Sequence, residues 1–353
     1  MLEKLHIRNY RILRELKIDQ LRRINLIAGG NNSGKTSLLE AIFLLGGAGS
    51  AHLLMNANVT RGDLGAAIQG VSIQIQGDTF WKPLFSDLDV SKRIEIRGHH
   101  PSRSQLTLEI STGEQRTIER SQNFTDRASE TNLPDIPSLR MQYRGHQGKQ
   151  VTSHIHVQGQ ELKFDQPRIN VPFPGTILLS RTVNVQEDVN RLARLRQQKR
   201  DHLLLKALQV IEPALQRVEE NSASGAPMIW GDIGLSELVP LAVMGEGMNR
   251  LARLVLGISS APKGVVLIDE IENGFHHSAL PEIWRAIDAA ARQFNTQVIA
   301  TTHSFECVSA AHESLNPDDF RLHRLDVIDD TVRCVTYEPE TIAAALRHNL
   351  EVR

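Results

Sequence analysis

The clearest chemistry in this sequence lies in the eight residues from Gly29 to Thr36. The run Gly-Gly-Asn-Asn-Ser-Gly-Lys-Thr matches the pattern G-x-x-x-x-G-K-[ST] at every required position. Its glycines permit backbone torsions that turn several N–H groups inward, toward a phosphate. Lys35 would reach the β- and γ-phosphate oxygens, and the Thr36 hydroxyl would ligate Mg²⁺. With ATP and Mg²⁺ as ligands, the predicted contacts are Gly29, Gly30, Asn31, Asn32, Ser33, Gly34, Lys35, Thr36 and Ser37.

An acidic pair downstream could supply the metal ligand and the base that such a site needs. Asp269 and Glu270 directly follow the apolar run Val265–Ile268. A buried central strand that ends in Asp places its carboxylate at the carboxyl edge of the sheet, where phosphate-bound Mg²⁺ sits. Asp269 is therefore predicted to hold Mg²⁺ and Glu270 to polarise the attacking water, with Glu272 as the next candidate base.

A histidine and a second glycine-rich loop complete the candidate set. His303 ends another apolar strand, 34 residues after Asp269, and we expect it to contact a γ-phosphate. Gly245, Glu246 and Gly247 begin a helix, and two glycines at a helix N-terminus suit an anion. Because the first loop already binds the phosphates of its own chain, this second loop is predicted to face the nucleotide of another subunit.

Apolar strands and amphipathic helices must position these residues. Ile24–Ala28 precedes the phosphate loop and the helical segment Ser37–Leu45 follows it, which is the strand–loop–helix context that the motif requires. Val265–Ile268 and Gln297–Thr301 are further strands, and a helix over Leu280–Phe294 lies between them. Strands that alternate with helices favour an α/β fold.

The middle of the chain alternates polar and apolar residues with period two, which predicts an antiparallel β layer. The segments concerned are Val71–Gln76, Arg93–Arg97, Gln105–Ile110, Leu139–Arg144 and Thr152–Val157. We expect a polar loop over 111–137, helices over 186–220 with a break at Pro213, and a strand over Pro227–Trp230. Phe320–Asp326 and Thr331–Tyr337 are expected to form a closing hairpin.

The composition is that of a globular protein in a reducing compartment. Hydrophobic residues make up 41% of the 353 residues and charged residues 23%, which excludes collagen-like and low-complexity chains. The 40 Lys and Arg nearly cancel the 41 Asp and Glu, which argues against a chain that coats nucleic acid over its whole surface. Two cysteines form neither a disulfide framework nor a metal clip, so we expect a cytoplasmic protein. The longest uncharged stretch, 41–60, is too polar to span a membrane.

The motifs follow one another in the order of an ABC-type ATPase head. The phrases IDEIENGFHH and ATTHS resemble most closely the ATPase domain of the overcoming-lysogenisation-defect (OLD) family, and also AAA-type, SMC-like ATPases of bacterial anti-phage systems. The resemblance covers about residues 1–100 and 175–353. It implies Walker A at Gly29–Thr36, Walker B at Asp269 and Glu270, a D-loop containing Asn273 and Gly274, a switch histidine at His303 and a signature segment at Met244–Met248.

The resemblance also implies a division of the chain. We expect an α/β P-loop NTPase, an ABC-type head with an antiparallel β layer and a helical lobe. Its parts would be an N-terminal ATPase lobe (1–100), a β-rich insertion (101–175) and a C-terminal ATPase lobe (176–353). The chain departs from the family where Gly245-Glu246-Gly247 replaces the usual serine and two glycines, so a hydroxyl contact to the γ-phosphate is missing. The glutamine loop falls near Arg181, Thr182 and Gln186.

The implied function is that of an ATPase, a dimeric switch driven by ATP, in prokaryotic anti-phage defence. Only 50 residues follow His303, so a nuclease or other effector is expected on a separate polypeptide. The alternative is an ATPase of DNA repair or recombination without a dedicated effector. A transporter subunit is disfavoured by the insertion, by the altered signature and by the ENGFHH loop.

Weaker signals remain open. Arg11 lies where an adenine or ribose contact often sits in ABC-type heads. DNA is a candidate partner because the stretch RLARLRQQKR concentrates Arg191, Arg194, Arg196, Lys199 and Arg200, although a solvated helix face is favoured. The histidines at 99, 100, 154, 156, 276 and 277 have no carboxylate or cysteine cluster at ligand spacing, so structural roles are favoured over metal binding.

Overall fold

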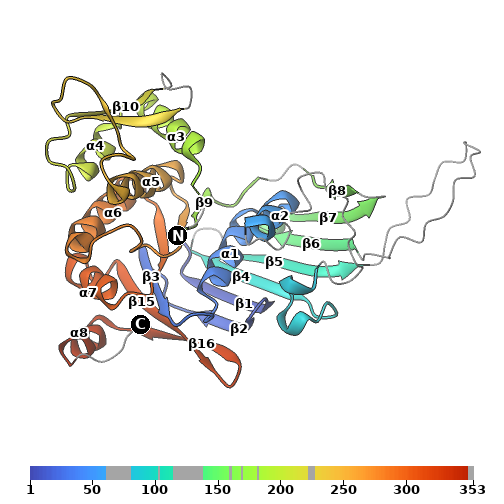
Figure 1. Cartoon of the computed structure of the whole chain (residues 1–353). Helices are drawn as coiled ribbons and strands as arrows, with labels where there is room; N and C mark the ends of the chain where they lie inside the picture. Colours follow the sequence, from blue (N-terminus) through green and yellow to red (C-terminus); the bar gives the residue numbers. More distant parts are fainter. Residues whose placement is uncertain are drawn as a thin grey trace, which may run out of the picture. The chain divides into compact units, whose positions relative to one another are not determined.

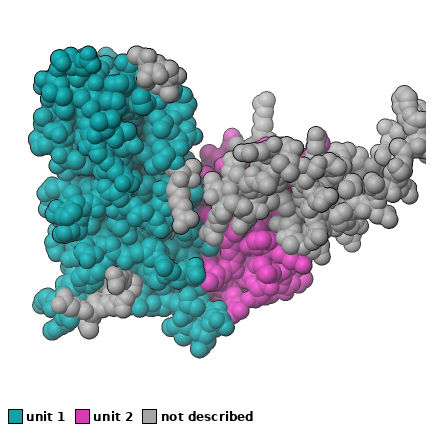
Figure 2. Space-filling model, in the orientation of Figure 1, with its two compact units in different colours: residues 1–4, 17–39, 173–353 teal, residues 5–16, 40–172 magenta. Residues whose placement is uncertain are grey.

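The computed structural model forms two compact units, shown in Figures 1 and 2. Unit 1 comprises residues 1–4, 17–39 and 173–353, and unit 2 comprises residues 5–16 and 40–172. The structure describes residues 1–60, 81–101, 104–113, 138–158, 161–167, 170–180, 183–221 and 227–348. The predicted strand Val71–Gln76, residues Arg181 and Thr182, and most of the predicted loop over 111–137 lie outside the described residues.

A six-stranded sheet forms the centre of unit 1 (Figure 1). Five of its strands are parallel, and the edge strand β16 runs antiparallel to its neighbour β15. Parallel strands buried on both faces are continuously apolar, as β13 is. In spatial order the strands are β16 (Thr331–Tyr337), β15 (Phe320–Ile328), β3 (Ile24–Gly29), β14 (Gln297–Thr301), β13 (Val265–Ile268) and β9 (Gly175–Leu178).

Helices of unit 1 share one apolar core with this sheet. The strongest contributors are α5 and α6, whose buried faces contain residues such as Leu254 and Trp284. The loop between β15 and β16 is a two-residue turn in which Asp329 and Asp330 have φ of 48° and 55°, as type I′ hairpins require. The helices are α3 (Val185–Gln197), α4 (His202–Leu208), α5 (Glu246–Ser260), α6 (Leu280–Phe294), α7 (Phe305–Ser314) and α8 (Pro339–Arg347).

A small antiparallel sheet corrects part of the helix prediction over 186–220. The helices α3 and α4 are present, but helical structure ends at Leu208, before Pro213. Arg217–Asn221 is instead the strand β10, which pairs with β11 (Met228–Asp232), and β11 also pairs with the short β12 (Val239–Pro240). Antiparallel pairing with the next strand along the chain overrides the local helix preference of this segment.

Unit 2 is built on a seven-stranded sheet in which successive strands from β4 to β8 pair antiparallel. One face is apolar: at Gly49, between two helices, a β-carbon would touch Leu108, Met141 and Tyr143. The opposite face carries the polar residues of the same strands. In spatial order the strands are β2 (Leu13–Ile18), β1 (Lys4–Tyr10), β4 (Ile94–His100), β5 (Ser104–Gly113), β6 (Ser138–Arg144), β7 (Gln150–Gln158) and β8 (Glu161–Asp165).

The helix α1 (Lys35–Gly46) begins in unit 1 and continues into unit 2, where α2 (Ala51–Thr60) follows. The antiparallel layer that period-two alternation predicts is therefore present, and it also takes in the first two strands of the chain. In this respect the compact units differ from the three consecutive segments expected above. Within the described residues, no helix is both long and apolar enough to cross a membrane.

Candidate nucleotide site

The phosphate loop connects β3 to α1 in the predicted strand–loop–helix order. Gly29, Asn32 and Gly34 have φ of 143°, 59° and 91°, in the left-handed region where a β-carbon causes strain. A β-carbon at Gly29 would lie 2.5 Å from the carbonyl oxygen of Leu325 on β15, so this position requires glycine for space as well. Turns of this kind form the concave backbone that binds anions, and the N-terminus of α1 adjoins it.

Lys35 lies across this loop and is almost fully buried. Its Nζ donates to the carbonyl oxygens of Gly29 at 2.7 Å and Gly30 at 2.8 Å. Burial lowers the pKa of Lys35 from 10.5 to about 8, although the negative charges of Asp269, Glu272 and Glu270 oppose this shift. A poorly hydrated ammonium that donates to two neutral carbonyls can exchange them for phosphate oxygens, which are stronger, charged acceptors.

The structure brings Thr36 and Asp269 together at the carboxyl edge of the sheet. The parallel register pairs Ile268 with Ala300, so β13 and β14 end side by side. Thr36 Oγ1 donates to Asp269 Oδ2 at 3.4 Å, and Thr301 Oγ1 donates to Asp269 Oδ1 at 2.7 Å. Hydroxyl and carboxylate oxygens are the ligands that Mg²⁺ prefers, so this pair fits a magnesium ion next to the phosphate loop.

Glu270 follows Asp269 in a strained backbone conformation, with φ of 47°. Its backbone N–H donates to Thr301 Oγ1 at 2.8 Å, and its carboxylate accepts from Asn273 Nδ2 at 2.6 Å. Arg250 on α5 donates from Nη2 to the carbonyl oxygens of Asp269 at 2.9 Å and of Glu270 at 3.3 Å. The backbone of the acidic pair is therefore held from two sides, and the role of Glu270 as base stays a prediction.

His303 also lies at this edge, immediately after β14. Its Nδ1 is 3.4 Å from Lys35 Nζ, and its backbone N–H donates to Glu272 Oε1 at 2.7 Å. The ring is half-buried next to the lysine that the motif directs to the terminal phosphates. Lys35, Thr36, Asp269 and His303 thus converge, although they come from three separate segments of the chain.

The atoms nearest to the glycines of the second glycine-rich loop do not belong to the phosphate loop. Gly245 caps α5 with φ of 117°, and a β-carbon there would meet nothing within 4 Å. A β-carbon at Gly247 would lie 3.1 Å from the carbonyl oxygen of Gly274, and one at Gly274 would lie 3.1 Å from Cγ of Glu246. The loop therefore packs on the segment after the acidic pair, while Gly245 and Glu246 stay exposed.

Arg11 belongs to unit 2, whereas the phosphate loop lies in unit 1. The Arg11 guanidinium is buried and forms an ion pair with Glu40 on α1, with Nε and Oε2 2.9 Å apart. Tyr10 donates its hydroxyl to the same carboxylate at 3.2 Å. Arg11 therefore has a structural partner, and its contact with a nucleotide stays a prediction.

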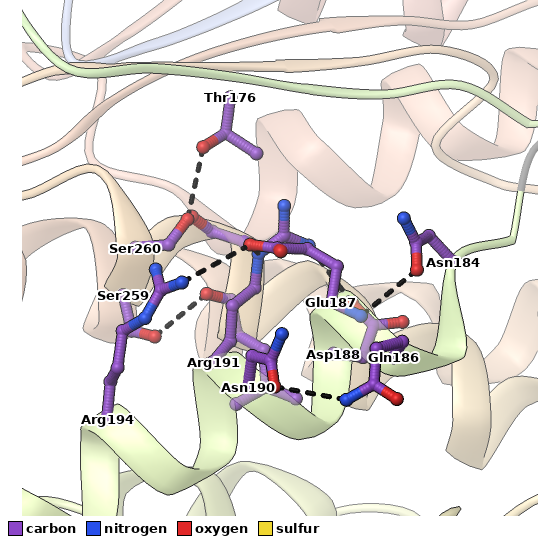
Figure 3. Close-up of polar contacts among 12 residues, drawn as sticks. Thr176, Asn184, Gln186, Glu187, Asp188, Asn190, Arg191, Arg194, Ser259 and Ser260 are labelled. Carbon is purple, nitrogen blue, oxygen red and sulfur yellow. Dashed lines mark hydrogen bonds and ion pairs between the residues drawn. The ribbon is translucent and has the colours of Figure 1, made fainter. Parts of the chain in front are cut away.

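Charged side chains of the basic helix α3 form ion pairs with one another, and Figure 3 shows Glu187, Asp188, Arg191 and Arg194 among its polar contacts. Asp188 is buried and accepts from Arg191 at 3.0 Å, and it also lies 3.4 Å from Arg253 on α5. Burial raises the pKa of Asp188, and the two guanidinium groups oppose this shift. Other cations are paired too: Arg194 with Glu187, Arg196 with Glu220, and Arg200 with the carbonyl of Gln293 and the ring of Phe294. This pattern fits a helix face held by ion pairs, and the exposed Lys199 lies just beyond it.

Other predicted residues make local contacts of their own. Gln186 is exposed on α3 and donates to Asn190 Oδ1 at 3.1 Å. His276 stacks on His277 and bonds Ser278, while His154 lies 3.9 Å from Asp165 on β8. Across the described part of the chain, no three histidine, cysteine or acidic side chains are grouped to hold a metal ion.

Two residues that the sequence analysis did not assign support the acidic pair. Thr301 binds both Asp269 and the backbone of Glu270, and Arg250 holds the carbonyls of the same two residues. Thr301 is the polar last residue of β14 and directly follows the apolar residues 298–300, which is a signal that could have been used. Arg250 is an arginine on the buried side of a helix, and a buried charge implies a partner.

The sequence of the chain is similar to those of known nucleotide-binding proteins. Residues 24–309 match the family described as "AAA domain, putative AbiEii toxin, Type IV TA system". The chain is 25% identical over 349 residues to an ATP/GTP phosphatase of Helicobacter pylori, a match that covers 91% of this chain and 90% of that protein. A shorter match, 50% identical over 42 residues, links 12% of this chain to 12% of the DNA replication and repair protein RecF of Nitrosococcus oceani.

The fold is that of an SMC head. The Smc head bound to the C-terminal winged-helix domain of ScpA gives a TM-score of 0.51 at 14% identity, covering 98% of this chain and 99% of that one. An Smc head of Pyrococcus furiosus, with an extended coiled coil and bound to the C-terminal domain of ScpA, gives 0.50 at 13% identity and covers 99% of each chain. The α/β head fold with an antiparallel layer, expected from the sequence, is confirmed.

Proposed function

The chain belongs to this AAA-domain family and is an ATPase with an SMC/ABC-type head, and from that premise we propose that it is an ATP-driven dimeric switch in prokaryotic anti-phage defence. The observation that carries the nucleotide chemistry is the convergence of Lys35, Thr36, Asp269 and His303 at one sheet edge. The narrower resemblance to the OLD family is part of the same proposal and rests on the IDEIENGFHH and ATTHS phrases.

In the proposed mechanism, separate residues bind the phosphates, hold the metal ion and activate the water. The phosphate loop binds the phosphates, and Lys35 turns from its two carbonyl partners to the β- and γ-phosphate oxygens. Thr36 and Asp269 hold Mg²⁺, which supplies positive charge next to the phosphates when it is bound. Glu270 accepts the proton of the attacking water, and His303 contacts the γ-phosphate. Glu270→Gln keeps the shape of the side chain and removes the base, so we expect ATP binding without turnover.

The dimer follows from the position of the second glycine-rich loop. Gly245 and Glu246 are exposed at the N-terminus of α5; a β-carbon at Gly245 would meet nothing within 4 Å, and the Glu246 side chain lies beside Gly274. A helix N-terminus with exposed glycine attracts an anion, and a second copy of the chain would bring one in its own ATP. Two chains related by a two-fold axis would then enclose two nucleotides, and ATP would favour their association.

Mixing two inactive variants tests this arrangement. Lys35→Ala removes the phosphate contact within one chain, and Gly247→Glu places a carboxylate where the partner's phosphate would lie. A dimer that pairs the two variants has one site with both lesions and one site with neither. Random pairing therefore leaves about a quarter of all sites intact. Recovery of ATP turnover on mixing supports a site that two chains share. Full turnover by a species that light scattering identifies as a single chain would contradict it.

A control is needed because Gly247 is tightly packed. Any β-carbon there comes within 3.1 Å of the Gly274 carbonyl oxygen, so a loss of activity in Gly247→Glu could reflect packing alone. Gly247→Ala introduces the same β-carbon without the charge. If the carboxylate is the cause, Gly247→Ala keeps most of the turnover while Gly247→Glu loses it.

The defence role rests on the family match, whose description names a toxin of a toxin–antitoxin system. We expect a separately encoded effector, such as a nuclease, to copurify with the full chain from the cytoplasm of its host. The two solved Smc heads are bound to ScpA domains, which supports partner binding by a head of this fold. Deleting the gene, or introducing Lys35→Ala, should abolish protection against phage. Unchanged phage titres would count against the role.

The alternative is an ATPase of DNA repair or recombination, for which the support is a local match to RecF. That match covers only 12% of either chain, too little to carry the activity of the whole protein. Sensitivity to DNA damage separates the two: a repair ATPase protects cells from damage in the absence of phage, and a defence ATPase does not. DNA binding by the purified chain would add weight to the alternative.

A further inference from the structure

The carboxylate of Glu272 lies at the site, where the sequence offered it only as the second candidate base. It follows Asp269 by three residues, in the segment after β13. Its Oε1 accepts the backbone N–H of His303 at 2.7 Å. Its Oε2 is buried and has no hydrogen-bond partner among the described residues. A buried polar atom of this kind calls for an explanation, because leaving it unpaired costs stability.

The bond to His303 falls where the strand ladder ends. Thr302 makes the last backbone bond of this segment to β3, through the carbonyl of Ile27 at 3.0 Å. The next N–H, that of His303, goes to Glu272, and the N–H of Ser304 goes to the Thr302 hydroxyl. Side-chain oxygens thus replace the carbonyl acceptors of the sheet at the point where the chain leaves it, and the Glu272 carboxylate accepts the N–H of His303.

We propose that Glu272 is a positioning residue for hydrolysis: Oε1 holds the backbone of His303, so that the His303 imidazole stays beside Lys35 and meets the γ-phosphate. The proposal deepens the function inferred above and rests on it, because it takes the histidine contact with the γ-phosphate as given. In this proposal Glu272 acts by orienting His303, and Glu270 remains the general base. The geometry agrees, because the Glu272 oxygen is engaged by a backbone N–H and not by Lys35 or Thr36.

Two substitutions separate positioning from base chemistry. Glu272→Gln keeps a carbonyl-type oxygen that can accept the His303 N–H, but it cannot take a proton from water at neutral pH. Glu272→Ala removes the acceptor altogether. A positioning residue is rescued by the conservative Gln variant, whereas a general base fails equally in both.

The first experiment measures kcat, KM and the equilibrium affinities for ATP and ADP in the presence of Mg²⁺. We expect Glu272→Gln to keep kcat within about threefold of the parent. Glu272→Ala should lower kcat about tenfold or more, the scale of a lost hydrogen bond to a charged group, while ADP affinity stays unchanged. ADP lacks the γ-phosphate, so retained ADP affinity also shows that the phosphate loop is folded. Equal loss of kcat in both variants, or equal loss of ATP and ADP affinity, would overturn the proposal.

The second experiment is a double-mutant cycle with His303→Ala. If Glu272 acts through His303, the double variant should be no worse than His303→Ala alone, because the histidine to be positioned is gone. Additive losses would overturn the proposal. If His303→Ala itself leaves turnover unchanged, the role of the histidine in the proposed function fails, and this inference fails with it.

Glu306 offers a matched control. Its carboxylate accepts from the Ser304 hydroxyl at 2.7 Å, so it acts on the same turn through Ser304. Glu306→Ala should leave kcat and both affinities within about twofold of the parent. A loss in Glu306→Ala as large as that in Glu272→Ala would show that any disturbance of this turn suffices, and the specific role of Glu272 would be refuted.

Discussion

Replacing Thr301 by valine should disable the site while leaving the sheet intact. Thr301 is fully buried at the end of β14, and valine has nearly the same shape. The hydroxyl donates to Asp269 Oδ1 at 2.7 Å and accepts the N–H of Glu270 at 2.8 Å. A single atom therefore orients both carboxylate residues, and valine removes that atom without creating a cavity.

The magnitude follows from the two bonds. A hydrogen bond to a charged carboxylate contributes about 1.5–3 kcal/mol, and an amide N–H left unpaired costs about 1–3 kcal/mol. The terms are not additive, and we expect a combined loss of about 3 kcal/mol in the geometry of the acidic pair. Such a loss corresponds to a decrease of about a hundredfold in kcat/KM for ATP.

Steady-state ATP hydrolysis with Thr301→Val, Thr301→Ser and Thr302→Val tests this reasoning. Serine keeps the hydroxyl and should retain most of the activity. Thr302 is equally buried, and its hydroxyl accepts the N–H of Ser304 at 3.0 Å and is hydrogen-bonded to the Cys307 side chain. Thr302→Val therefore controls for the loss of a buried hydroxyl away from the carboxylates. Turnover by Thr301→Val equal to that of Thr302→Val would refute the idea that Thr301 organises the acidic pair.

The remaining predictions concern Lys35 and the ion pairs of α3. Lys35→Ala should weaken ATP binding by at least about 1.5–3 kcal/mol, because a charge-assisted contact is lost; unchanged affinity by calorimetry would dismiss the phosphate-loop assignment. Because the pKa of Lys35 is lowered to about 8, ATP affinity should fall as the pH rises through 8. Between about pH 8 and pH 10.5 the contribution of Lys35 to the free energy of unfolding should rise with pH, because the unfolded chain binds more protons there than the native one. Denaturant titrations of the parent and of Lys35→Met over this range check the sign. Asp188→Ala removes the buried carboxylate that pairs with Arg253 and should lower the free energy of unfolding by about 3–5 kcal/mol. Gln186→Ala, at an exposed position, should change it little, and equal denaturation midpoints of the two variants would contradict this prediction.

Much of the fold could be predicted because its elements are regular. In the central sheet β13 is a short, fully apolar run, and the β layer alternates with period two, as in β6, which spans the predicted Leu139–Arg144. The prediction was wrong at Arg217–Asn221, a polar strand without periodic apolar residues that pairs with Met228–Asp232. Nothing within that segment indicates its partner, because strand pairing is a property of two segments and not of one.

The sequence by itself determined the phosphate loop, because the glycines, Lys35 and Thr36 are contiguous and act through local backbone geometry. It also indicated Asp269, Glu270 and His303, since each follows directly on a recognisable strand. Only the tertiary structure assigned the residues that hold these groups: Thr301 to the acidic pair, Arg250 to its backbone and Glu272 to the histidine. The reason is physical. These contacts span 19 to 32 residues of sequence and arise from the parallel register of β13 and β14 and from the packing of α5, so no local pattern encodes them.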